Sequence, residues 1–168
     1  MDRLTLLHQT LLEGLAQIAG VRHCSPFPKR RDEVRLPAIF LDLAELEPAR
    51  DPGTGELALI AHWEARVLVS DRQPEAVLWS LVQAVMLWLY DHAWAELNVG
   101  RANIKQAAPD HFSPEYQGHR IWLVEWTHTL RVGESIWAGE GIVPDTVILA
   151  WNGEAGDQLE LTGDDPDV

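Results

Sequence analysis

Residues 119–137 read HRIWLVEWTHTLRVGESIW, and the alternation of residue types in this stretch decides the fold class. Successive residues of an extended chain lie on opposite faces, so two sets separate between residues 121 and 132. One set is apolar and aromatic: Trp122, Val124, Trp126, Leu130 and Val132. The other begins apolar and becomes polar: Ile121, Leu123, Glu125, Thr127, Thr129 and Arg131.

The first of these two faces predicts a strand covered by a helix. Burial of one large apolar side chain contributes about 1.5–3 kcal/mol, so the core alone accounts for the aromatic residues. The second face predicts a surface open to solvent or to a neighbouring subunit, because its polar half has no reason to enter a core.

Two helices are predicted on the N-terminal side of this strand. Residues 2–19 carry apolar residues at three- and four-residue steps, with Asp2 placed to cap the first turn and Gly20 to end the helix. Residues 74–94, PEAVLWSLVQAVMLWLYDHAW, hold a wider apolar stripe. The stripe is Leu78, Leu81, Val82, Val85, Trp88 and Leu89, broadened by Val77, Met86 and Leu87. Its width predicts a helix buried on more than one side.

A long β-hairpin is predicted between the two helices. Residues 36–48 and 57–70 alternate as strands, and the PARDPGTGE segment between them is dense in Pro, Gly and charge. Because this connection is longer than the usual hairpin loop, we expect residues 47–56 to form a protruding arm. Residues 21–35, with two prolines and most of the local basic charge, are expected to be a loop, and a short strand is expected near Ile104.

The predicted order is helix, two strands, helix, strands. It favours an α+β fold in two layers, an antiparallel sheet with a long hairpin covered by two main helices. We assign residues 1–137 to this single domain and residues 138–168 to a Gly-rich, acidic C-terminal extension. The last 16 residues, GEAGDQLELTGDDPDV, hold six acids and no base, which is typical of a tail that is solvated or ordered by a partner.

Charge and cysteine content exclude several classes of protein. The net charge of −13 makes the chain a poor candidate for wrapping nucleic acid or coating anionic lipid. The single cysteine, Cys24, allows no intrachain disulfide and no cysteine-based zinc site. The first 20 residues lack the pattern of a signal peptide, and no apolar run is long enough for a membrane span.

Candidate chemistry is sparse, and no catalytic, cofactor-binding or metal-ligating residues are assigned. His62, Glu64 and His128 have the residue types of a metal site, but alternation places His128 on the aromatic face and the other two on the opposite face. Asp110, Tyr116 and His119 could host acid–base chemistry, but any loop of similar composition would offer the same groups. Short glycine pairs occur without the following Lys or helix start of a phosphate loop.

Assembly is the better-supported prediction. Open sheet edges, a long arm and an acidic tail together are typical of a protein that binds copies of itself. The candidate interface residues come from three places: the basic segment, the arm and the polar strand face. They are Lys29, Arg30, Arg31, Glu47, Arg50, Asp51, Glu56, Glu125, Thr127, Thr129 and Arg131.

In the order and character of these elements the chain resembles the tail terminator proteins of long-tailed bacteriophages. The resemblance covers residues 1–137: the first helix, the hairpin LPAIFLDLAELEPARDPGTGELALIAHWEARVLVS, the long apolar helix and the final strand HRIWLVEWTHTLRV. It rests on no short diagnostic motif, and no family residue is carried over. The segment from Gly139 onward departs from the family's minimal pattern.

The resemblance implies a structural virion protein at the junction of tail and neck, assembled in the host cytoplasm. Such proteins form a ring, usually a hexamer, that caps the tail tube, stops its polymerisation and presents a docking surface to the head–neck connector. No enzyme activity, cofactor or membrane contact is implied. DNA passes through the lumen without specific binding, and an acidic wall suits that passage because it repels a polyanion.

Three other functions remain open on the sequence. A neck or head–tail joining protein of the same assembly would share the size, the acidity and the ring symmetry. A small-molecule-binding or enzymatic α+β domain would need a deep pocket with convergent polar groups. A host regulatory module that binds protein partners is the third.

Overall fold

The computed structural model describes residues 2–27, 34–110 and 118–138, and the strands at 146–150 and 158–162. The chain divides into two compact units, Met1–Ser135 (unit 1) and Ile136–Val168 (unit 2), which are described separately.

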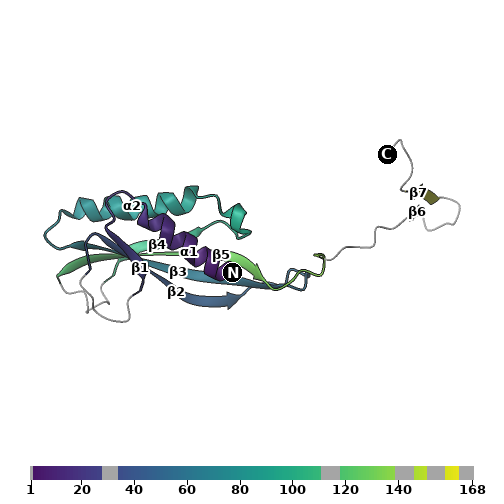
Figure 1. The fold of residues 1–168 in the computed structure, drawn as a ribbon, viewed down its shortest axis with the longest axis horizontal. Helices are drawn as coiled ribbons and strands as arrows, with labels where there is room; N and C mark the ends of the chain where they lie inside the picture. The colour runs from purple at the N-terminus through teal and green to yellow at the C-terminus, as the bar shows by residue number, and fades with distance from the viewer. Residues whose placement is uncertain (1, 28–33, 111–117, 139–145, 151–157, 163–168) are drawn as a thin grey trace. The chain divides into compact units, whose positions relative to one another are not determined.

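Unit 1 is built on a five-stranded sheet with the strand order β1-β2-β3-β5-β4 (Figure 1). The strands are β1 His23–Pro26, β2 Ala38–Pro48, β3 Leu57–Ser70, β4 Asn103–Pro109 and β5 His119–Val132. Strands β2 and β3 form the predicted hairpin, and β3 pairs with β5 along the whole of both strands, from Leu57↔Val132 to Ser70↔His119. The alternation in the sequence therefore identified the two central strands with their correct bounds.

Strand β1 corrects two predictions. It falls within residues 21–35, which were expected to be a loop, and it pairs with β2 in parallel, so the sheet is mixed and mostly antiparallel. A strand of four residues that ends in proline has little pattern of its own. Its partner β2 supplies the pairing, which is a tertiary effect.

Two helices cover one face of the sheet, α1 Arg3–Ala16 and α2 Glu75–Asp91 (Figure 1). This confirms the two-layer α+β arrangement. Asp2 caps α1 as expected, since its carboxylate accepts a hydrogen bond from the Thr5 amide at 2.8 Å. The helix ends at Ala16, however, four residues before Gly20. A 3₁₀ turn, η1 Trp94–Leu97, follows α2.

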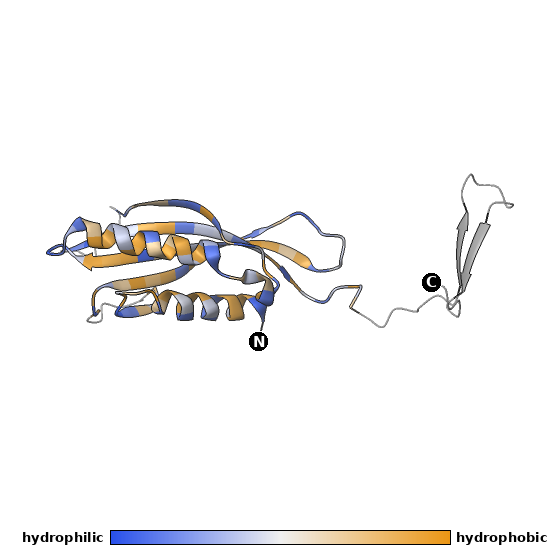
Figure 2. Ribbon diagram, turned by 90° about the horizontal axis from the view of Figure 1, so that it is seen from above, coloured by the Kyte–Doolittle hydropathy of each residue, from blue (hydrophilic) through white to orange (hydrophobic). Residues whose placement is uncertain are grey.

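The main core lies between the helices and the sheet. From β5 it contains Val124, Trp126, His128 and Leu130, all on the face predicted to be covered, and Trp63 lies beside Trp126 on β3. Helix α1 contributes the buried residues Leu7, Leu11 and Leu15 to this core. Helix α2 contributes Leu78, Leu81, Val82, Val85 and Leu89. Apolar residues recur along both helices and along the strands beneath them (Figure 2).

A second, smaller cluster lies on the opposite, outer face of the sheet. Ala38, Phe40, Leu68 and Ile121 are buried there under Phe27, Val34 and Leu36. This cover explains why both faces of β2 are buried at its start, while the rest of the strand is mostly exposed.

Helix α2 corrects a third prediction, because it is not buried on all the sides that its apolar residues suggested. Leu87 is 52% exposed, Trp79 51% and Tyr90 72%. Only the stripe toward the sheet is fully buried, since α2 forms the outer layer of unit 1.

Unit 2 holds a two-stranded antiparallel hairpin, β6 Thr146–Ala150 and β7 Gln158–Thr162. The strand at 158–162 lies within the acidic segment that was expected to be a tail. The expectation that this segment is solvated or ordered by a partner stays a prediction.

Candidate functional site

The arm is the connection between β2 and β3. Its tip is shaped locally: the Asp51 carboxylate accepts a hydrogen bond from the Gly53 amide at 2.8 Å, and Gly53 and Gly55 have φ angles of +69° and +78°. These backbone conformations disfavour side chains with a Cβ, so the turn depends on both glycines.

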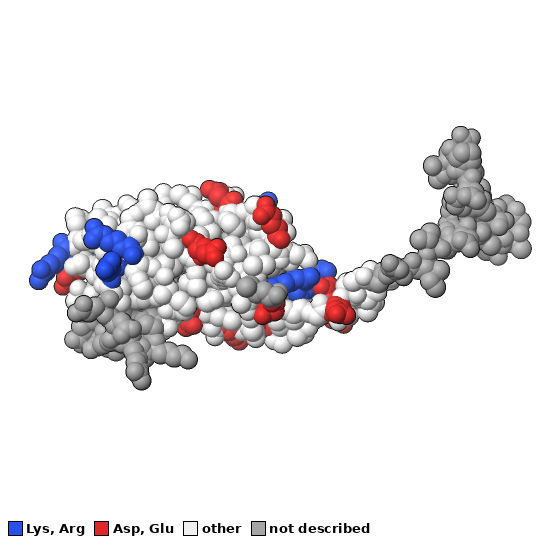
Figure 3. All heavy atoms as spheres, viewed as in Figure 1, with Lys and Arg blue, Asp and Glu red and all other residues white. Residues whose placement is uncertain are grey.

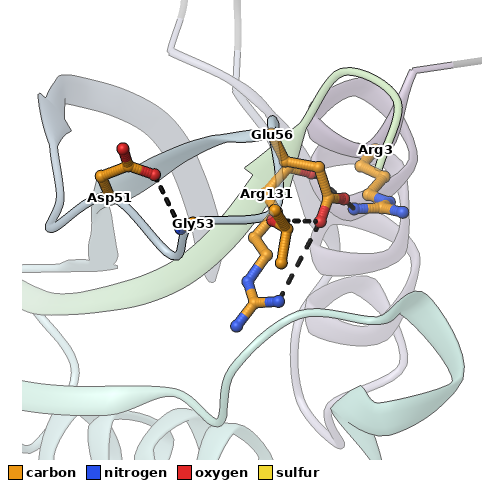
Figure 4. Close-up of polar contacts among 6 residues, drawn as sticks. Arg3, Asp51, Gly53, Glu56 and Arg131 are labelled. Atoms are coloured by element: carbon orange, nitrogen blue, oxygen red, sulfur yellow. Dashed lines mark hydrogen bonds and ion pairs between the residues drawn. The ribbon is translucent and has the colours of Figure 1, made fainter. Parts of the chain in front are cut away.

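The base of the arm is fixed by Glu56 (Figure 4). Its carboxylate, 9% exposed, accepts hydrogen bonds from Arg3 at 3.3 Å and from the Thr54 hydroxyl at 3.0 Å, and it lies 4.0 Å from the Arg131 guanidinium. Arg3 also donates to the Arg131 carbonyl oxygen at 2.6 Å. These contacts join the start of α1, the arm and the end of β5, three segments far apart in the sequence.

A hollow of about 700 Å³, here called the arm cleft, lies next to this network. Four predicted interface residues line it: Arg50, Asp51, Thr129 and Arg131. Ala95 of η1 and the residues that follow this turn, Asn98, Val99 and Gly100, also line it. Charged side chains of both signs lie close together at this end of unit 1 (Figure 3). The structure thus places residues of the arm and of β5, which the sequence analysis treated as two separate candidate surfaces, around one cleft.

Three other predicted interface residues do not line the arm cleft: Glu47 of the arm, and Glu125 and Thr127 on the polar face of β5. Glu47 contacts the His62 ring at 3.1 Å, and Glu125 accepts a hydrogen bond from Gln106. Thr127, at 5% exposed, is buried and offers little surface to a partner. Lys29, Arg30 and Arg31 lie outside the described residues.

The three residues considered for a metal site do not come together, and Tyr116, considered with Asp110 and His119 for acid–base chemistry, lies outside the described residues. His62 and Glu64 lie on the outer face, and His128 is buried on the inner face, as the alternation predicted. Asp110 is engaged by Arg66 at 3.2 Å. Among the described residues no group of three or more potential ligands could hold a metal ion.

His128 is a neutral residue of the core. Its Nδ1 lies 2.8 Å from the Gly100 carbonyl oxygen, and its ring packs 4.4 Å from the Trp94 ring. Burial is the main cause that lowers its pKa to about 4, because the charged form would lose its hydration. His92 nearby lowers the pKa further.

A second surface was not predicted. A shallow groove of about 600 Å³, here called the α2–β4 groove, is lined almost wholly by apolar side chains. Its residues are Trp79, Val82, Gln83, Met86, Leu87, Tyr90, Ile104, Ala107 and Trp122. The signal was present in the sequence, since Trp79 and Tyr90 lie off the buried stripe of the helix, but the width of the stripe was assigned to burial instead.

A scan against models of known protein families matches none of them, and a search of curated proteins finds no relative of this chain. Among the described residues, no helix combines the length and the apolar composition that crossing a bilayer requires.

Proposed function

We propose that this chain is a structural protein of a long-tailed bacteriophage. It assembles into a ring, caps the tail tube, stops tube polymerisation and provides the surface on which the head–neck connector docks. The order of α1, the β2–β3 hairpin, α2 and β5 matches the element order on which the resemblance to tail terminators rests.

The observation that carries the proposal is the amount of apolar surface that unit 1 leaves uncovered. Trp79, Leu87 and Tyr90 are each at least half exposed and line one groove. Contiguous exposed apolar surface of this kind is typical of an interface, because large apolar side chains gain free energy when a partner covers them.

The arm cleft supports the same function. It is lined by a cation and an anion from one loop, Arg50 and Asp51, together with residues from the end of β5. Paired charges of opposite sign at the edge of a subunit suit a repeated contact between identical copies, since each copy offers both signs. Repetition of one such heterologous contact closes into a ring when the rotation between subunits allows it.

The acidity of the chain fits a lumen through which DNA slides. Acidic side chains stand as separate spots over the face of unit 1 in Figure 3, and the net charge is −13. A wall of this sign repels the phosphate backbone and so does not hold the passing DNA. The partners in this function are further copies of the chain, the tube protein and the neck connector, with no cofactor.

The decisive experiment deletes the gene in the phage or prophage that encodes the chain and measures tails by electron microscopy. Overlong tails are expected, because nothing then stops tube growth. Tails of normal length detached from heads would instead indicate a head–tail joining protein. Intact particles of normal length would contradict both functions.

A further inference from the structure

The sheet of unit 1 has two edges to which no further strand is added in the part of the chain that the structure describes. Strand β4, seven residues long, pairs only with β5. On the other side of the sheet, β1 pairs with the first four residues of β2, and residues 42–48 pair with β3 alone. An open edge presents unpaired N–H and C=O groups, which favour the addition of another strand. Each edge is about 23 Å long, at about 3.3 Å per residue.

These two edges carry opposite charges. Residues 42–48, here called the acidic edge, hold no base and three exposed acids: Asp42, Glu45 and Glu47. Residues 101–109, which are β4 and the two residues before it and are here called the basic edge, hold no acid and two exposed bases: Arg101 and Lys105. Among the described residues neither base forms an ion pair, and only Glu47 of the three acids does, with His62. The charges of both edges are therefore available to a partner.

Apolar side chains lie along both edges on the face of the sheet that the helices cover. On the acidic edge Leu46, 41% exposed, is paired with Ala61 of the main core. On the basic edge Ile104 is paired with Trp126 of the same core, and it lines the α2–β4 groove. Directly paired residues of neighbouring strands share a face, so Leu46 and Ile104 lie on the same side of the sheet.

The directions of the strands suit a contact that repeats from copy to copy. Each of the pairs β2–β3, β3–β5 and β5–β4 is antiparallel, so β2 and β4 run in opposite directions. When a second copy continues the sheet with its helices on the same side, its β2 therefore lies antiparallel to β4 of the first copy. Alignment of the two edges over their length places Lys105 opposite residues 45–47 and Arg101 toward the arm.

Two edges of the same kind do not suit each other. Two acidic edges would set three carboxylates against three, and antiparallel pairing of two β4 strands over their length would bring their Lys105 side chains close together. Lys105 also lies at the register shift of β4, and an edge lysine at such a bulge discourages pairing with a strand that offers no acid. Only a basic edge and an acidic edge join opposite charges, and such complementarity determines which surfaces meet.

We infer that the basic edge of one copy binds the acidic edge of a second copy as an antiparallel strand, so that the sheet continues from subunit to subunit with Leu46 toward the α2–β4 groove of the neighbour. The contact is heterologous, because each copy uses its basic edge toward one neighbour and its acidic edge toward the other. Both edges belong to unit 1. The contact rests on the self-assembly proposed above and is the one that holds the ring together.

The test uses full-length variants and sedimentation velocity. Lys105→Glu reverses a charge of the basic edge, and Glu45→Lys reverses one of the acidic edge. Each should raise the dissociation constant about tenfold or more with unchanged circular dichroism, because like charges then meet. The controls Arg72→Glu and Asp71→Lys make the same changes of net charge at exposed positions in the turn after β3, and they should associate like the wild type. Equal losses in the controls, or wild-type association of Lys105→Glu or Glu45→Lys, would overturn the inference.

Mixing the two edge variants tests directly whether the unlike edges meet. The Lys105→Glu chain has a glutamate in place of the lysine of its basic edge and keeps an intact acidic edge, whereas the Glu45→Lys chain keeps an intact basic edge. An equimolar mixture restores opposite charges at every contact when the two chains alternate, so it should recover the association that each variant loses alone.

A mixture that associates as weakly as the separate variants would overturn the inference, as would a wild type that stays monomeric up to its solubility limit. Stronger association of Lys105→Glu alone than of the wild type would also overturn it, because relief of repulsion between two basic edges would show that like edges meet.

These outcomes are independent of the proposed function. If association survives in Lys105→Glu, the ring must be held elsewhere, and the role in tail termination is untouched. If the deletion strain makes normal tails, that role fails even when the two edges bind each other.

Discussion

Arg3, at the start of α1, donates a hydrogen bond to the carboxylate of Glu56 at 3.3 Å, although 53 residues separate them. Glu56 was predicted as an interface residue, yet its side chain is 9% exposed and serves to hold the arm against the body of unit 1. The position of the arm, and with it the shape of the arm cleft, depends on this contact.

Glu56→Gln should lower the free energy of unfolding by about 1 kcal/mol, because it removes the negative charge that accepts the hydrogen bond from Arg3. The effect is small because the Arg3 side chain is about one-third exposed, so solvent screens the ion pair. Urea denaturation followed by tryptophan fluorescence measures the change. Glu47→Gln is the control, since Glu47 pairs with His62 in solvent and its loss should have almost no effect. Equal effects in both variants would show that Glu56 has no special role.

Arg50→Glu should weaken self-association without affecting stability, because Arg50 is exposed at the arm cleft and reversal places two acids side by side with Asp51. Sedimentation equilibrium would report the loss as a rise in the dissociation constant of tenfold or so, the effect of about 1.4 kcal/mol. Arg72→Glu reverses an exposed charge in the turn after β3 and controls for net charge. An equal loss in Arg72→Glu would point to general repulsion rather than to the cleft.

Gly14→Ala should destabilise the protein, against the general rule for helices. In an exposed helix this change adds about 1 kcal/mol of stability. Here a Cβ on residue 14 would overlap the indole of Trp88, which lies against α1 at this point. Forcing α1 and α2 apart should cost about 1–3 kcal/mol, measured by thermal unfolding. In a Trp88→Leu background the alanine should no longer be harmful; a penalty that persists there would mean that Trp88 is not the obstacle.

Because His128 is neutral in the folded protein, the free energy of unfolding should decrease when the pH is lowered. In the unfolded chain the imidazole of His128 takes up a proton near pH 6.5. In the folded protein the imidazole stays neutral down to its pKa of about 4. Unfolding therefore binds a proton between these values, so the stability from this residue is complete above pH 6.5 and decreases by about 3 kcal/mol as the pH falls to 4.

Urea denaturation at a series of pH values tests this, with His128→Gln for comparison. Glutamine can keep the hydrogen bond to the Gly100 carbonyl oxygen but does not titrate, so the variant should lose this part of the pH dependence. An unchanged pH profile in His128→Gln would place the titrating group elsewhere.

The parts of the fold that the sequence predicted are those whose pattern is local and long. Strands β3 and β5 each alternate over 14 residues, so their faces, and the opposite placement of His62 and His128, followed directly. Strand β1 has four residues and no alternation that stands out, and its existence depends on pairing with β2.

The surfaces were harder to predict for a different reason. Apolar side chains on α2 indicate burial, but whether Trp79 or Leu87 meets a second layer depends on what the rest of the chain places above the helix. Likewise, the sequence gives no sign that residues 3, 56 and 131 meet, because only the pairing of β3 with β5 and the packing of α1 bring them together. Glu56 was predicted as an interface residue from its charge, and the structure shows in addition that its carboxylate is largely buried and bonded to Arg3.

Cryo-electron microscopy of the tail ends of the encoding phage tests the central claim most directly, namely that the open surfaces of this chain are contacts between copies in a terminating ring. We predict one closed ring of this chain at the head-proximal end of each tube, with the α2–β4 groove covered in every subunit. Tail ends that lack the chain, or a ring in which Trp79, Leu87 and Tyr90 remain exposed to solvent, would contradict the account.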